Sequence, residues 1–79
     1  MNTVHHLCLY DDYATFDGVA IPFGAKLIEE TLTETLSSLL DEIIPKIGSG
    51  EVVVCGEDPV RRMAGRKLED RLGREVKYE

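Results

Sequence analysis

The clearest pattern in the chain is a stripe of aliphatic residues that runs from residue 24 to residue 47. These residues return mostly at spacings of three and four, and acidic residues occupy many positions between them. That period is typical of an amphipathic α-helix with one apolar face. Pro45 lacks a backbone donor and restricts the residue before it, and a link of glycine and serine follows. We therefore expect regular helix to end near Ile44, with a trailing turn to Ile47.

Residues 1–23 are rich in aliphatic and aromatic side chains, with two short polar breaks. Asp17-Gly18 is a strong signal for a two-residue hairpin turn. Asp11-Asp12 is compatible both with a turn and with a bulge inside one long strand. The segment therefore predicts either a hairpin of two strands or an antiparallel meander of three.

Residues 52–55 form an unbroken apolar run between Gly50 and Gly56. A run without alternation is typical of a short strand that is covered on both faces, usually in a parallel arrangement. We expect this strand to be the central one of the sheet.

The segment after that strand predicts a second helix and a last strand. Asp58 is a candidate cap for free helix amides, and residues 59–72 carry apolar positions along one face. Gly73 supplies a left-handed stop, and residues 75–78 then alternate as a short strand. Residues 51–78 thus have the size of one βαβ unit, for which a right-handed crossover is expected.

Together these elements predict a single small α/β domain over residues 1–79. A hairpin or meander (1–23) precedes a long amphipathic helix (24–47) and a right-handed βαβ unit (51–78). The order is β-β-(β)-α-β-α-β, with two helices packed on a mixed sheet of four to five strands, and the strand order stays open.

Composition narrows the class of protein. The apolar fraction of 43% is ordinary for a folded domain, and no apolar run approaches the roughly 18 residues of a membrane span. The first residues lack the basic start and apolar stretch of a secretory signal. We therefore expect a soluble cytoplasmic protein without membrane association.

Charge is unevenly spread along the chain, whose net charge is -6. Residues 1–60 hold two basic and eleven acidic side chains, whereas residues 61–79 hold seven basic and four acidic ones. Such polarity can orient two copies head to tail, or let the basic end meet an acidic partner. The overall negative charge makes nucleic acid an unlikely ligand.

Cysteine and histidine offer little chemistry. Cys8 and Cys55 each lie in an apolar, strand-like run, where a free thiol usually behaves as a small buried hydrophobe. A disulfide between them would require neighbouring strands and an oxidising compartment, so we expect free thiols. His5 and His6 are adjacent, so in a strand they point to opposite faces and cannot both bind one zinc ion.

Gly56 follows a valine-rich strand and precedes a helix, as the glycines of phosphate-binding loops do. It is a single glycine, however, and Glu57 and Asp58 place negative charge where a phosphate would lie. Nucleotide binding is therefore not expected.

Four acids fall where chemistry often gathers in an open α/β sheet, at the carboxyl ends of strands. Asp11 and Asp12 follow the first strand, Glu30 lies early in the long helix, and Asp58 follows the apolar strand. This arrangement and the element order are similar to a reduced ribonuclease H-like core. The resemblance implies two divalent ions, Mg²⁺ or Mn²⁺, held by these four residues for phosphodiester cleavage. In the competing interpretation, Asp11 and Asp12 lie in a solvated turn, Glu30 favours the helix start through its interaction with the helix dipole, and Asp58 caps the second helix.

The long helix is also a candidate interface. Leu32, Leu36, Leu39 and Ile43 follow the 4, 3, 4 spacing of a coiled-coil seam, within a stripe that is wide for a small sheet to cover. The simpler alternative is packing against the chain's own sheet. Because so small a core is marginally stable, we expect a homo-oligomer, in the first instance a dimer.

Arginines on the second helix are the other candidate interface. Arg61, Arg62 and Arg66 lie in its first half, where cations are slightly unfavourable to the helix dipole. They therefore suggest a docking surface, with a solvated face supported by an Arg66 to Asp70 pair as the alternative.

The leading hypothesis is a small non-enzymatic interaction or regulatory module. It would self-associate and dock on an unidentified protein partner, without a cofactor. The alternative is the metal-dependent nuclease described above.

Overall fold

The order of elements along the chain is that of the predicted α/β domain, with three strands in the first part. The computed structural model describes residues 3–23 and 29–79. Asp11 and Asp12 form a bend, which separates two strands and so selects the meander over the hairpin. The elements are β1 (Val4–Leu9), β2 (Tyr13–Phe16), β3 (Val19–Pro22), α1 (Glu29–Ile47), β4 (Glu51–Gly56), α2 (Val60–Leu72) and β5 (Lys77–Tyr78).

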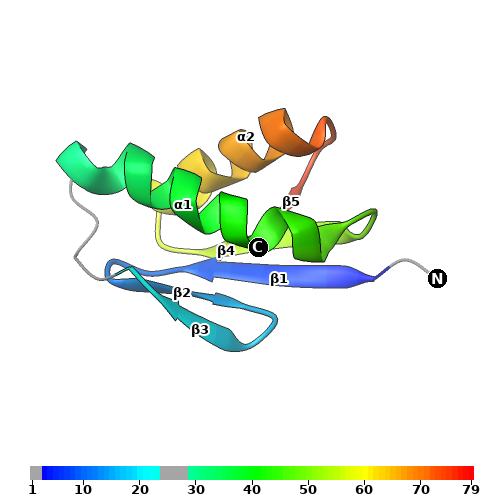
Figure 1. The fold of residues 1–79 in the computed structure, drawn as a ribbon, viewed down its shortest axis with the longest axis horizontal. Coiled ribbons are helices and arrows are strands. Elements are labelled where there is room, and N and C mark those ends of the chain that lie inside the picture. Colours follow the sequence, from blue (N-terminus) through cyan, green and yellow to red (C-terminus); the bar gives the residue numbers. More distant parts are fainter. Residues whose placement is uncertain (1–2, 24–28) are drawn as a thin grey trace.

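The described strands form one mixed sheet in the order β3-β2-β1-β4-β5 (Figure 1). β2 is antiparallel to both β1 and β3, whereas β4 is parallel to β1 and to β5. The pairing of β1 with β4 joins the meander to the βαβ unit, and its register sets Leu7 beside Val54. The sheet therefore has two edges, β3 and β5, that belong to different halves of the chain.

Both helices lie on the same face of the sheet (Figure 1). Burial along β4 alternates accordingly, because Val52 and Val54 are buried whereas Val53 and Cys55 are half-buried. The expectation of a central strand covered on both faces is therefore wrong. β1 occupies the middle of the sheet, and no helix of the described segments packs on the second face. An unbroken apolar run does not reveal this, since β-branched residues also favour a face that is only half-buried.

The core lies between the helices and this sheet face. It is built from aliphatic residues of α1 and α2 and from alternate residues of the strands. Its fully buried large side chains are Leu7, Leu9, Leu36, Leu40, Ile43, Val54 and Leu68.

α1 continues through Pro45 to Ile47, so the expected end of regular helix near Ile44 is wrong. Ile47 is 3% exposed, and its burial in the core favours a further helical turn after the proline. A proline so close to the end removes only one late hydrogen bond. The predicted start of this helix at residue 24 lies outside the described residues.

The end of α2 is as predicted. Gly73 is left-handed, with φ of 72°, and its amide donates to the Glu69 carbonyl. β5 is shorter than expected, because it begins at Lys77 rather than at residue 75. The amide of Val76 donates to Oε2 of Glu69 at 3.1 Å instead of to a strand.

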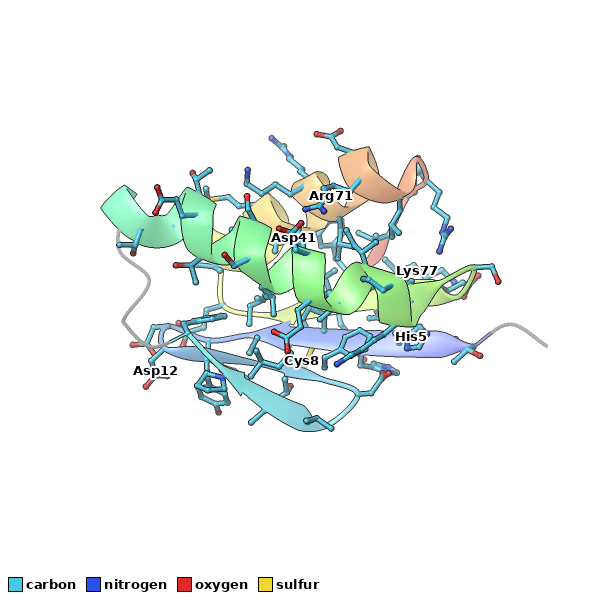
Figure 2. All side chains as sticks on the ribbon, in the orientation of Figure 1. His5, Cys8, Asp12, Asp41, Arg71 and Lys77 are labelled. Atoms are coloured by element: carbon cyan, nitrogen blue, oxygen red, sulfur yellow. A yellow bond between two sulfur atoms is a disulfide. The ribbon has the colours of Figure 1, made fainter. Side chains whose placement is uncertain are left out.

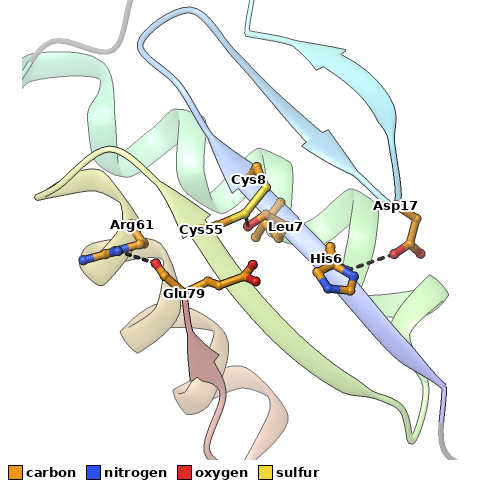
Figure 3. Close-up of a disulfide and its surroundings, with 7 residues drawn as sticks. All are labelled: His6, Leu7, Cys8, Asp17, Cys55, Arg61 and Glu79. Atoms are coloured by element: carbon orange, nitrogen blue, oxygen red, sulfur yellow. Dashed lines mark hydrogen bonds between the residues drawn. A yellow bond between two sulfur atoms is a disulfide. The ribbon is translucent and has the colours of Figure 1, made fainter.

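The two cysteines form a disulfide, which corrects the expectation of free thiols (Figure 3). Register places Cys8 directly beside Cys55 on adjacent parallel strands, with the Cα atoms 4.4 Å apart. Their neighbours Leu7, Leu9 and Val54 point into the core, so the bridge lies on the sheet face opposite the helices. Disulfides persist mainly in oxidising compartments. The bond is therefore at odds with the cytoplasmic location that the sequence predicts.

None of the helices within the described ranges is long and apolar enough to cross a membrane.

Candidate functional site

A groove runs between the edge strand β3 and helix α1. It consists of two adjoining hollows of about 270 and 400 Å³, which share Ile21, Pro22 and Glu42 in their walls. Its apolar lining comes mainly from β3 and the residues next to it, namely Phe16, Val19, Ala20, Ile21, Pro22 and Phe23. The α1 wall is mostly polar, and its one apolar member, Leu39, is buried.

β3 has β2 as its strand neighbour on one side and no strand of the described chain on the other. The Phe23 amide donates to the Asp12 carbonyl at 3.1 Å, so by alternation the polar backbone of Ile21 and Val19 also faces β2. The amide of Ala20 therefore points outward. Edge strands are commonly protected by charged side chains, and β3 carries none. Pro22 has no amide, so of the residues of β3 Ala20 alone offers a partner strand both an amide and a carbonyl at the outer edge.

Acidic side chains border this groove on the α1 side. Glu34 and Glu42 lie along its length, while Lys46 stands at one end. The border of the groove is therefore negatively charged over most of its length and positively charged at one end.

A histidine and an aspartate close the end near the β2–β3 turn. Nδ1 of His5 lies 2.7 Å from Oδ2 of Asp17. The amide of His6 donates to the other carboxylate oxygen at 2.9 Å (Figure 3). The His5 ring also stacks on Phe16, with centroids 5.3 Å apart. Asp17 adopts a left-handed backbone with φ of 51°, as aspartate tolerates in a two-residue turn.

The pKa of Asp17 lies below its ordinary value. Partial burial raises this pKa, but the hydrogen bonds from His5 and from the His6 amide, together with the nearby histidine charges, outweigh that effect. A carboxyl group with a depressed pKa in the folded state stabilises the protein above its unfolded-state pKa of about 4. That contribution is lost as the pH falls through the lower folded-state value.

We expect Asp17→Asn to flatten the acid limb of the stability curve. Asparagine accepts the His6 amide bond and tolerates the left-handed backbone, but it does not titrate. The free energy of unfolding from urea titrations between pH 2 and pH 6 is the measurement. Asp70→Asn on exposed α2 is the matched control, and an equal change of slope in both variants would contradict the role of Asp17.

The predicted metal ligands do not gather among the side chains that the structure describes. Asp11 and Asp12 follow β1 in the chain. Asp12 lies at the end of the sheet where β1 stops (Figure 2). Asp58 follows β4, whose carboxyl end lies beside that of β1 at the same end of the sheet. Within the described part of the chain, no group of three histidine, cysteine or acidic residues is placed to hold an ion. The side chain of Glu30 lies outside that part, so the Mg²⁺ or Mn²⁺ centre stays a prediction.

Asp58 does not cap α2, which corrects a further expectation. The N-cap position is Pro59, without a side-chain hydrogen bond. The Asp58 carboxylate instead accepts from Nε and Nη2 of Arg61 at 3.1 and 2.9 Å and lies 3.7 Å from Arg62. Two guanidinium groups compete more effectively for this carboxylate than neutral amides do.

Most of the predicted α1 interface is occupied by the chain's own core. Leu36, Leu39 and Ile43 are at most 3% exposed, and Leu32 packs half-buried against them. This is the simpler alternative that the sequence left open. A partner of the folded chain therefore needs another surface.

Sequence reasoning missed the β3 groove, although a signal was present: residues 19–23 are apolar, uncharged and next to a hairpin turn. No family model, curated protein or solved structure matches this chain. The function is therefore argued from geometry.

Proposed function

We propose that this protein is a non-enzymatic interaction module that binds an extended segment of a protein partner along β3. The observation that carries this proposal is the uncharged edge strand beside an apolar groove with an acidic border. An added strand would pair with the outward backbone of Ala20, and its alternate side chains would enter the groove. Main-chain hydrogen bonds give such complexes affinity, and side-chain pockets give them specificity.

Charge defines the chemistry of the partner segment. Its apolar side chains would cover Ile21 and Phe23, and basic side chains would lie near Glu34 and Glu42. An acidic segment would be repelled by the same border. A second copy of this chain is a poor occupant, because it brings an equal acidic border and a net charge of -6. Self-association, which the sequence predicts, stays a prediction that the following experiment also tests.

The backbone part of the proposal is tested with Ala20→Pro. Proline removes the outward amide while the bonds to β2 stay intact, so we expect an eight-residue peptide of alternating valine and lysine to lose binding at least tenfold. Fluorescence anisotropy of the labelled peptide gives the affinity. An amide correlation spectrum of the variant checks that the fold is retained. Unchanged affinity in a folded variant would contradict strand addition.

The charge part is tested with Glu42→Lys. One exposed ion pair contributes up to about 1 kcal/mol, so we expect about fivefold weaker binding of the valine-lysine peptide. Glu75→Lys, an exposed position outside the groove, makes the same change in net charge and should have little effect. Equal losses of affinity in the two variants would mean that the peptide is attracted by the net charge of the protein and not by the acidic border of the groove. Sedimentation at equilibrium reports the mass, and a dimer that Ala20→Pro dissociates would identify a second copy as the occupant and overturn the partner proposal.

A further inference from the structure

A second hollow, of about 410 Å³, lies at the opposite edge of the sheet, between α2 and β5. Its walls are Arg61, Arg62, Arg66, Glu69 and Tyr78. No residue of the β3 groove takes part in it. Hydrogen-bond donors, from three arginines and a phenol, therefore outnumber the one carboxylate in these walls.

Arg61 forms a fixed wall of this hollow. Its guanidinium donates twice to the Asp58 carboxylate. It donates once more, through Nη1, to the main-chain oxygen of Glu79 (Figure 3). The side chain is 20% exposed. Its charge is therefore matched within the chain, and its role is to hold β5 against α2.

Arg62 and Arg66 are in a different state. They lie one helical turn apart on one face of α2, where like charges at this spacing repel each other. The Arg62 side chain is 69% exposed, and its Nε lies 3.7 Å from the Asp58 carboxylate, a loose contact. Arg66 is exposed, and within the described part of the chain it has neither a hydrogen bond nor an ion pair. The Arg62 contact uses Nε alone, so its two terminal nitrogens and the whole Arg66 guanidinium are available to a ligand.

Tyr78 supplies a neutral donor beside them. Its ring lies against α2 at Gly65, where a Cβ atom would fall 2.4 Å from the hydroxyl oxygen. Burial and the charge of Glu69 raise the pKa of Tyr78, against the opposing charges of Arg66, Arg62 and Arg61. The hydroxyl therefore keeps its proton at neutral pH.

Glu69 is the only acid among the residues that line this hollow in the described structure, and one of its oxygens is already used. Oε2 accepts the Val76 amide at 3.1 Å, which closes the connection between α2 and β5. Glu69 therefore serves the local fold, and it offsets only one of the two available guanidinium charges.

We propose that the hollow between α2 and β5 binds a phosphoryl group, held by Arg62 and Arg66 and by the hydroxyl of Tyr78. Guanidinium groups bind phosphate oxygens through pairs of parallel N–H donors. A phosphoryl group carries close to two negative charges at neutral pH, which matches two guanidinium groups better than a single carboxylate does. The group would come either from free phosphate or from a phosphorylated residue of a protein.

The test is an amide correlation titration with inorganic phosphate, phosphoserine and a phosphoserine-containing peptide, each at constant ionic strength. We expect saturable shifts at Arg62, Arg66 and Tyr78 and none along β3. Tighter binding of the peptide than of phosphate identifies a phosphorylated protein as the source, and equal binding identifies the free ion. Shifts that grow linearly without saturation would overturn the proposal.

Charge variants on one helix complete the test. We expect Arg66→Gln and Arg62→Gln each to weaken binding at least tenfold, and Tyr78→Phe to weaken it about threefold. Lys67→Gln removes the same charge one residue away, outside this hollow, and should change binding less than twofold. An equal loss in Lys67→Gln and Arg66→Gln would show diffuse attraction to α2 and overturn the assignment. Because the β3 variants leave this hollow intact, failure here is distinguishable from failure of the proposed function.

Discussion

Loss of the bond between Cys8 and Cys55 is expected to lower the free energy of unfolding by about 4 kcal/mol. The cysteines are 47 residues apart in sequence, and closing a loop of that length restricts the unfolded chain by roughly this amount. A domain of this size is stable by only about 4 to 12 kcal/mol in total. The double variant Cys8→Ala with Cys55→Ala should therefore unfold with a midpoint at a low urea concentration. Circular dichroism during a urea titration gives that midpoint.

Two comparisons isolate the cross-link from the lost side chains. Wild-type protein treated with a phosphine reductant should unfold at nearly the same urea concentration as the double variant, because both lack the bond. Val53→Ala removes a half-buried side chain from the same sheet face and should cost far less. Coincident unfolding of the oxidised protein and the double variant would contradict a stabilising bridge.

The second large effect is expected from Gly56→Ala, which should destabilise the fold by about 3 kcal/mol or more. Gly56 has φ of 112°, a backbone conformation that residues with a Cβ atom rarely adopt. A Cβ atom there would also fall 2.1 Å from the carbonyl oxygen of Leu9. The three nearest atoms all belong to the Leu9 backbone, so no flexible side chain can move away. The midpoint of thermal unfolding is the measurement.

Gly48→Ala is the matched control for that variant. Its φ of 55° is also positive, but a Cβ atom there would meet nothing within 4 Å. The expected cost is only the left-handed conformation, about 1 to 2 kcal/mol. If the two alanine variants melt at the same temperature, close approach to β1 is not the reason for Gly56.

Local patterns were sufficient to predict the elements because their causes are local. The three-and-four spacing of Leu36, Leu39 and Ile43 describes α1 directly, since one face of a helix must meet the core. Asp17-Gly18 likewise locates a turn whose backbone few other residues accept. Gly73 ends α2 for the same reason.

What sequence could not predict depends on neighbours that are distant in the chain. Nothing in residues 52–55 shows that β1 lies beside β4, so neither the disulfide nor the uncovered sheet face could be inferred. Asp58 has the properties of a cap, and only the position of Arg61 decides otherwise. The open edge of β3 depends on strand order in the same way, because an uncharged strand is a docking surface only where the sheet ends.

The disulfide also divides the molecule covalently. Residues 8–55 form a closed ring of chain that contains β2, β3 and α1, whereas α2 and β5 follow outside it. A single proteolytic cut within the ring, for example at the Gly48 turn, leaves one covalent molecule as long as the bond is oxidised. A cut between β4 and α2 instead separates the arginine-bearing segment from the ring. The two proposed binding surfaces thus share one sheet but differ in what holds them to the protein once the backbone is broken.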